Sequence, residues 1–475
     1  MPSSPILPIS TPAPKAAIIV GSGLAGLSAA SQLLKHNIPI HLLERAPKPG
    51  GNSIKASSGI NGSPTKYQPK FLSGPDDAFY SDTVKSAGQA MSSMTVHRER
   101  LIATLTNESA GVVDWLVQQG VDLSRVAQLG GHSNPRTHRG AGNLPPGASI
   151  ITTLLKSLQE SPLFHLQTSC TVTKVLGSGN RVTGVEITSA EGEKSTLYGP
   201  VIFAAGGFAG DAQGMLAQYR PDLGSYPSTN EPRPGMQSLL TAVGAKLVDM
   251  ELVQVHPTGF MDPKDPTSPV KFLAAELLRG EGGILLVDGK RFVNELDTRE
   301  HITDVITKMV PASTLPKQWD VQLVLDEGIY KMAKSHIDFY VWKGLMRKTT
   351  ISDLGPTALG AIQEYAKVAA GSLPDHFGRT SFANWTLTEP NPDSVIYVGT
   401  VTPVIHFTMG GALINENSEV FNDQDTIIEG LWAAGEITGG VHGGNRLGGS
   451  SLLECVVFGR RAGDACAAYL GTREE

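Results

Sequence analysis

The expected fold is decided by one stretch, Ala16-Ala17-Ile18-Ile19-Val20-Gly21-Ser22-Gly23-Leu24-Ala25-Gly26, an apolar run followed by glycines at the spacing Gly-x-Gly-x-x-Gly. The short β-branched run predicts a buried strand, and residues 27–35 have the apolar spacing of a helix. A second apolar run, residues 38–43, predicts another strand and ends at Glu44. Strand, glycine turn, helix, strand and acid together form the context in which this fingerprint binds a dinucleotide.

The fingerprint has a physical reason at each position. Glycines let the backbone approach a pyrophosphate at the N-terminus of a helix, where free N–H groups and the helix dipole favour an anion. Glu44, at the end of the second strand, can accept hydrogen bonds from ribose hydroxyls. The small-residue segment 50–61 follows and would let a flat cofactor lie against the backbone.

Two further apolar runs end in glycines in the same way, at residues 201–207 and 430–436. Strand ends that return to one crevice from three distant parts of the chain indicate a discontinuous doubly wound domain. No second Gly-x-Gly-x-x-Gly follows any of these strands, so we expect one tightly bound dinucleotide and no separate nicotinamide domain.

The middle of the chain has a different character, with more charged and aromatic residues and helical stretches such as residues 357–370. We therefore predict an α/β fold: a doubly wound, Rossmann-like and discontinuous dinucleotide-binding domain with an inserted α+β capping domain. The expected division is a disordered Pro/Ser-rich tail (1–14), the first part of the dinucleotide-binding domain (15–255), the capping domain (256–392) and the second part of the dinucleotide-binding domain (393–475).

Composition excludes several classes of protein. The 475 residues are 40% hydrophobic and 18% charged, which rules out a disordered chain, and a net charge of −6 argues against nucleic-acid binding. The three cysteines, Cys170, Cys455 and Cys466, cannot supply a disulfide framework or the four thiolates of an iron–sulfur cluster, and no CxxCH haem motif occurs. No stretch reaches the roughly 18 apolar residues of a membrane span and no leader is visible. We expect a cytoplasmic protein without metal, nucleic acid or membrane.

Several polar residues are candidates for chemistry. Glu276 and Arg279 are three residues apart, on one helical face, which in isolation is typical of a surface ion pair worth under about 1 kcal/mol. His256 and His406 are, taken alone, compatible with buried structural histidines. Arg446 lies in the glycine-rich run 439–449, where a cation with few aliphatic neighbours favours an anionic ligand.

Taken together, these motifs resemble the soluble fumarate reductases, relatives of the flavoprotein subunit of succinate dehydrogenase, and most of all the fungal type that carries only FAD. The resemblance extends from about residue 15 to the C-terminus. Beyond the first glycine turn it rests on Gly51-Asn52-Ser53, His256-Pro257-Thr258, Ala274-Ala275-Glu276, Asn294-Glu295-Leu296, Thr298-Arg299, His406-Phe407-Thr408-Met409-Gly410-Gly411 and Asn445-Arg446-Leu447-Gly448-Gly449-Ser450-Ser451-Leu452-Leu453-Glu454-Cys455. This combination outweighs the structural interpretation of the histidines and of the ion pair.

The resemblance implies FAD as the cofactor. A histidine bonds the flavin covalently in membrane-bound relatives, and Asn52 matches that position, which implies non-covalent FAD. Where many relatives have Gly-Asp-Gly, this chain has Pro234-Gly235-Met236. The implied cofactor contacts are Gly21, Ser22, Gly23, Leu24, Ala25, Gly26, Glu44, Arg45, Gly51, Asn52, Ser53, Ser57, Ser58, Gly59, Ile60, Asn61, Val172, Ala204, Ala205, Gly206, Glu436, Arg446, Ser451 and Leu452.

For the reaction, the resemblance implies reduction of fumarate to succinate, with hydride from flavin N5. Arg299 matches the proton donor, and Glu276 and Arg279 match the pair that relays protons to it. The implied diacid-binding groups are His256, Glu276, Arg299, His406, Arg446 and Gly449, with His256 also counted among the catalytic candidates. The implied electron donor is diffusible, reduced FMN or FAD.

Two other interpretations remain open from the residues. The same scaffold can serve a related flavin ene-reductase or dehydrogenase, such as one acting on ketosteroids, or an amino-acid oxidase. A flavin-binding structural or sensor protein without turnover is a third class. The charged residues favour a small diacid over a steroid, which needs an apolar cleft, and a scaffold would have no use for Arg299.

Overall fold

The glycine fingerprint folds as a strand–turn–helix unit at the centre of the largest sheet. In the computed structural model, which describes residues 16–69, 76 and 78–471, β1 (Ala17–Val20) runs into the glycine turn and α1 (Leu24–Lys35). β2 (Ile40–Leu43) then returns parallel to β1, with Val20 opposite Leu43. All four residues of β1 are buried, as expected for a parallel strand covered on both faces. The predicted tail, residues 1–14, lies outside the described residues.

Three strands from distant parts of the chain lie side by side in this nine-stranded sheet, as predicted. β10 (Val201–Phe203) pairs in parallel with β1 on one edge and with β21 (Ile427–Ala433) on the other. The main order is β6-β2-β1-β10-β21-β8-β7. The remaining members are β6 (Phe164–Gln167), β7 (Thr171–Ser178), β8 (Arg181–Thr188), β9 (Lys194–Tyr198) and β20 (Glu419–Phe421). This arrangement confirms the predicted α/β fold with a discontinuous, doubly wound domain.

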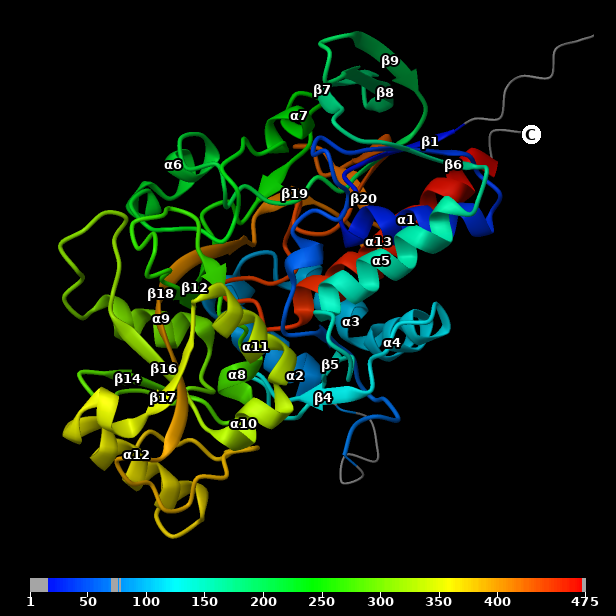
Figure 1. The fold of residues 1–475 in the computed structure, drawn as a ribbon. Coiled ribbons are helices and arrows are strands. Elements are labelled where there is room, and N and C mark those ends of the chain that lie inside the picture. The colour runs from blue at the N-terminus through cyan, green and yellow to red at the C-terminus, as the bar shows by residue number, and fades with distance from the viewer. Residues whose placement is uncertain (1–15, 70–75, 77, 472–475) are drawn as a thin grey trace, which may run out of the picture.

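Helices α1, α5 (Pro146–Gln159) and α13 (Ser450–Gly471) lie together on one side of this domain (Figure 1). The contact between α1 and α13 is close because α13 presents glycines to it. A Cβ at Gly459 would lie 2.5 Å from the carbonyl oxygen of Ala25, and one at Gly463 would lie 2.7 Å from that of Ala29. The last helix of the chain is thereby packed directly against the first.

A second sheet of seven strands forms the other lobe, at the lower left of Figure 1. Its order is β13-β12-β18-β16-β14-β15, with β17 also paired to the long β18. The strands are β12 (Val253–Phe260), β13 (Phe272–Leu273), β14 (Ile284–Val287), β15 (Lys290–Arg291), β16 (Val321–Leu325), β17 (Arg347–Thr350) and β18 (Val395–Thr408). The division of the chain at residues 255 and 392 stays a prediction.

Helices on this lobe include α12 (Pro356–Ala369), where the sequence predicts a helix over residues 357–370. The others are α8 (Leu277–Gly280), α9 (Arg299–Thr307), α10 (Glu327–Met332) and α11 (Lys334–Lys343). The helices elsewhere in the chain are α2 (Ala78–Ala87), α3 (Thr95–Asn107), α4 (Ser109–Gln118), α6 (Met215–Tyr219) and α7 (Gln237–Thr241). One three-stranded sheet consists of β3 (Ile60–Asn61), β4 (Arg125–Ala127) and β5 (Thr137–Arg139). A second three-stranded sheet consists of β11 (Leu247–Val248), β19 (Gly411–Leu413) and β22 (Thr438–Gly439). Within the described ranges, no helix combines the length and apolarity needed to cross a membrane.

Candidate active site

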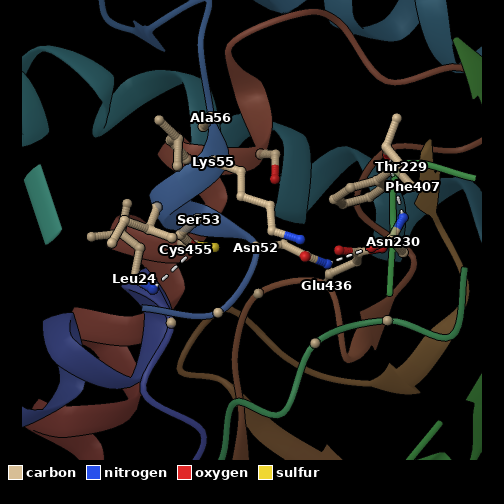
Figure 2. A pocket seen from close by; sticks show the side chains of 18 of the residues that line it. Leu24, Asn52, Ser53, Lys55, Ala56, Thr229, Asn230, Phe407, Glu436 and Cys455 are labelled. Atoms are coloured by element: carbon tan, nitrogen blue, oxygen red, sulfur yellow. Dashed lines mark hydrogen bonds between the residues drawn. The ribbon is translucent and has the colours of Figure 1, made fainter. Parts of the chain in front are cut away.

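A cavity of about 560 Å³ lies where the carboxyl ends of the parallel strands face the second lobe. Gly21, Ala204 and Ala434, the residues that follow β1, β10 and β21, all line it. Ligands of open α/β sheets bind at such strand ends. Figure 2 shows Leu24, Ser53 and Cys455 on one side of this cavity and Thr229, Asn230 and Phe407 on the other, with Asn52 between the two groups.

The glycine turn gives one end of the cavity the form of a dinucleotide cradle. Gly21 has a φ of +105°, and a Cβ there would lie 2.3 Å from the carbonyl oxygen of Ala204, so a side chain would collide with the neighbouring strand end. Gly23 is the N-cap of α1, which leaves the helix N-terminus facing the cavity. Glu44 is buried at the end of β2 and accepts a hydrogen bond from the Ser22 N–H at 3.1 Å. These features fit the pyrophosphate and ribose of FAD.

The structure brings most of the expected cofactor residues to the wall of this one cavity. Those that line it are Gly21, Ser22, Gly23, Leu24, Ala25, Glu44, Arg45, Gly51, Asn52, Ser53, Ser57, Ser58, Gly59, Val172, Ala204, Ala205, Gly206, Glu436, Arg446, Ser451 and Leu452. Gly26, Ile60 and Asn61 are not part of the lining. A Cβ at Gly26 would lie 2.0 Å from the Gly21 carbonyl oxygen, and the Asn61 amide donates to the Gly448 carbonyl at 2.8 Å, so these two residues support the wall.

Two polar side chains lie near the middle of the cavity. Asn52 donates a hydrogen bond from its side-chain amide to Asn230, and Figure 2 shows this contact. Glu436 lies close by and accepts a hydrogen bond from the Thr408 N–H at 3.0 Å. Burial raises the pKa of Glu436 to about 7, against the opposing effect of that N–H group. A carboxyl group that changes protonation near neutral pH therefore borders the cofactor cavity.

The other end of the cavity is strongly cationic. Arg299, His406, Arg446 and Gly449 line it, and His256 lies directly behind them, with its ring centroid 5.4 Å from that of His406. Thr298 caps α9 by accepting a hydrogen bond from His301 N–H, which fixes Arg299 as the first residue of that helix. Four side chains from β12, α9, β18 and the glycine-rich run therefore converge, although the sequence separates them by up to 190 residues.

Burial and the surrounding arginines determine the charge of these groups. Burial, and then the Arg299 charge, hold the pKa values of His256 and His406 well below 6.5, so both imidazoles are neutral at pH 7. Burial and the Arg299 charge also lower the pKa of Arg446 to about 9. Among the described residues, Nε2 of His256 and Nε of Arg446 are buried without a hydrogen-bond partner. Buried donors of this kind are expected to meet a ligand.

Glu276 forms the link from Arg299 to Arg279. It lies immediately before α8, is 1% exposed, and accepts a hydrogen bond from Arg299 Nε at 2.7 Å. Its other oxygen accepts from the Gly130 N–H at 3.0 Å and lies 3.8 Å from Arg279 Nη2. Burial alone would raise the pKa of Glu276, but Arg299 and Arg279 lower it to about 2. The carboxylate is therefore ionised between two guanidinium groups, and this pair is not a surface ion pair.

Sequence reasoning did not identify Gln254. This buried amide accepts a hydrogen bond from Arg299 Nη1 at 2.9 Å and donates to the Arg446 carbonyl at 2.8 Å, so it joins the two arginines. Gln254 lies two residues before His256 on β12, and residues at this spacing on a strand face the same side, so the position of His256 could have indicated that Gln254 belongs to the site. Asn230 and the cavity-lining residues of α11 carry no comparable signal in the sequence.

No group of His, Cys, Asp and Glu that could hold a metal ion occurs in the part of the chain that the structure describes.

The comparisons with known proteins point to the same cofactor as the geometry of the cavity, FAD. The sequence model of the family described as FAD binding domain matches residues 16–452. The chain is 43% identical to fumarate reductase 1 of Saccharomyces cerevisiae, over 95% of this chain and 98% of that protein. It is 38% identical to the fumarate reductase of Schizosaccharomyces pombe, over 96% and 90% of the two chains. The open conformation of a flavocytochrome c3 fumarate reductase superposes with a TM-score of 0.73, at 30% identity, over 96% of this chain and 78% of that one.

Proposed function

We propose that this chain, which belongs to the FAD-binding family that includes the fungal fumarate reductases, reduces fumarate to succinate with FAD as its cofactor. The observation that carries the proposal is the cationic end of the cavity. Arg299, Arg446 and His256 are buried there and His406 is half-buried, and two of their nitrogen atoms have no hydrogen-bond partner among the described residues. Two carboxylates on a short carbon chain would supply those partners.

The residues that face the diacid have two roles: some would bind its carboxylates and one would protonate it. Arg446 and His406 would bind one carboxylate, with the Gly449 backbone beside them, and His256 would meet the other. When reduced, the bound FAD supplies the hydride that one alkene carbon receives. Negative charge then develops toward the adjacent carboxylate, and fixed cations in a dry site stabilise it without reorganisation.

Arg299 would donate the proton that the other alkene carbon needs. Its guanidinium is held at two positions, by Glu276 and by the Gln254 amide at 2.9 Å, which aims the remaining N–H groups at the cavity. A strong acid is unnecessary because a carbanion accepts the proton, and Glu276 would return a proton to Arg299 immediately. Arg279 would extend the relay, since two of its nitrogens have no hydrogen-bond partner among the described residues.

The cofactor contacts predict non-covalent attachment, because Asn52 has no nucleophilic atom and its amide is engaged by Asn230. The electrons would come from a diffusible donor, reduced FMN or FAD. A steroid substrate is disfavoured, because Arg299, His406 and Arg446 line this end of the cavity and would face its apolar rings.

The test is reoxidation of the photoreduced holoenzyme under nitrogen. Fumarate should restore the flavin absorbance, whereas the monocarboxylate crotonate should not, since it leaves one of the two carboxylate-binding subsites without its ligand. Arg446→Gln should slow the reaction with fumarate, and Arg347→Gln, at an exposed position on β17, is the matched control. Equal rates with fumarate and crotonate would refute a site for two carboxylates.

A further inference from the structure

The glycine turn Gly448-Gly449 lies between the proton relay and the wall behind it. A Cβ at Gly448 would lie 2.7 Å from Glu276 Oε2 and 3.1 Å from Arg299 Nη2, so the backbone of the turn packs directly on these two side chains. Gly449 has a φ of +82° and lines the cavity. The position of this turn therefore affects both the relay and the part of the wall that faces the ligand.

The peptide that joins Gly448 to Gly449 is held from behind by two side chains. The Gly448 carbonyl accepts hydrogen bonds from the Asn61 amide at 2.8 Å and from His132 Nε2 at 3.0 Å. This peptide is trans, and in a planar trans peptide the C=O and the N–H point in opposite directions, so the Gly449 N–H points away from both side chains. It donates to no atom of the described residues. The N–H is thus available to a carboxylate of the ligand.

The protonation of His132 is fixed by Arg136. The Nδ1 atom of His132 lies 2.8 Å from Arg136 Nη1, and a guanidinium can only donate hydrogen bonds. Nδ1 is therefore the acceptor, and the proton of the neutral imidazole is on Nε2, which donates it to the Gly448 carbonyl. Burial, and then the Arg136 charge, lower the pKa of His132 to about 4, which agrees with a neutral ring at pH 7.

Arg136 is held in turn by two carboxylates. It is fully buried, and it donates from Nε to Asp76 at 2.8 Å and from Nη1 to Asp82 at 2.7 Å. Ser133, the neighbour of His132 in the chain, donates its N–H to Asp82 at 2.7 Å. A buried polar network whose members are hydrogen-bonded in this way is rigid. The imidazole of His132 is therefore fixed in place before any ligand binds.

We propose that His132 is a positioning residue of the diacid site, which holds the Gly448-Gly449 turn so that the Gly449 N–H meets a carboxylate of the ligand. The inference rests on the proposed function. His132 is not part of the cavity lining, so it acts through the turn and does not touch the ligand. A donor that is already oriented needs no reorganisation when the carboxylate arrives, and this favours binding.

Two amide substitutions separate the two contacts of His132. The glutamine nitrogen can take the place of Nε2 and keep the donor to Gly448, whereas the asparagine oxygen can take the place of Nδ1 and keep only the acceptor for Arg136. Equilibrium dialysis of radiolabelled succinate against each holoenzyme measures the Kd. His132→Asn should raise the Kd about five- to tenfold, and His132→Gln should stay within about twofold of the wild type. His165→Asn, at an exposed position on β6, is the matched control and should leave the Kd unchanged.

The order of the two variants distinguishes positioning from structural support. A normal Kd in His132→Asn with a raised Kd in His132→Gln would overturn the proposal, because His132 would then serve only Arg136. A Kd that is raised equally in both variants, or unchanged in both, would overturn it as well. Loss of FAD from both variants would also overturn it, by showing that His132 supports the fold. A wild-type holoenzyme that binds no succinate would refute the proposed function, whatever anchors the turn.

Discussion

Replacing Arg446 by methionine should make the protein more stable and its diacid binding weaker. Arg446 is 3% exposed and its guanidinium lies 4.2 Å from the centre of the Phe407 ring, with no carboxylate in hydrogen-bond contact among the described residues. Burial and the Arg299 charge lower its pKa from 12.5 to about 9. At about 1.4 kcal/mol per pKa unit, this shift corresponds to a penalty of about 5 kcal/mol for holding the charge there.

Part of that penalty is offset by the contact with Phe407, which is worth about 2 kcal/mol for a desolvated cation. Methionine keeps apolar packing on the ring and removes the charge, so the apoprotein of Arg446→Met should gain about 2–3 kcal/mol in the free energy of unfolding. The denaturation midpoint in urea, compared with that of the control Arg347→Met on exposed β17, measures the gain.

Succinate affinity should change in the opposite direction. A hydrogen bond between a charged guanidinium and a carboxylate contributes about 1.5–3 kcal/mol, so the Kd for succinate should rise about 10–150-fold, as measured by the perturbation of the FAD spectrum. A lower urea midpoint together with an unchanged Kd would refute the reasoning, because Arg446 would then be a structural residue with a partner in the fold.

Four further predictions follow from the same geometry. Arg299→Ala should lower kcat by several powers of ten while succinate still perturbs the flavin spectrum, and Arg299→Lys, which keeps the charge without the planar fork, should recover little of it; a near-normal kcat in Arg299→Ala would place the acid elsewhere. Because the pKa of Glu276 is lowered from 4.5 to about 2, the ionised carboxylate contributes about 3 kcal/mol of stability above pH 4.5 that is lost as the pH falls toward 2, so urea unfolding of Glu276→Gln should depend less on pH between 4.5 and 3 than that of the wild type. Acid precipitation should release all of the yellow FAD into the supernatant, since Asn52 cannot bond it, and flavin retained in the pellet would contradict this. Gly21→Ala should abolish FAD retention on gel filtration, because its Cβ would lie 2.3 Å from the Ala204 carbonyl oxygen at a φ of +105°.

The strand ends around the cofactor cavity could be predicted because local patterns specify them. A short β-branched run closed by glycine is visible at β1, β10 and β21, and the right-handed, parallel crossover rules leave few ways to arrange such strands. The sequence alone therefore predicts that Gly21, Ala204 and Glu436 approach one crevice, and all three line the cavity. The positions at which the chain passes between its two lobes stay a prediction.

The charged end of the cavity and the support behind it were decided by tertiary structure. Nothing local shows that Gln254 joins Arg299 to Arg446, or that His132 meets Gly448, because these pairs come from segments that are distant in sequence. The chemical state of the site has the same origin: neutral His256, ionised Glu276 and an Arg446 with a lowered pKa arise from burial beside Arg299. Residue types and spacing determine which groups the chain can offer, whereas desolvation and Coulomb interactions at distances of a few ångströms determine how those groups are charged, and only the packed chain sets those distances.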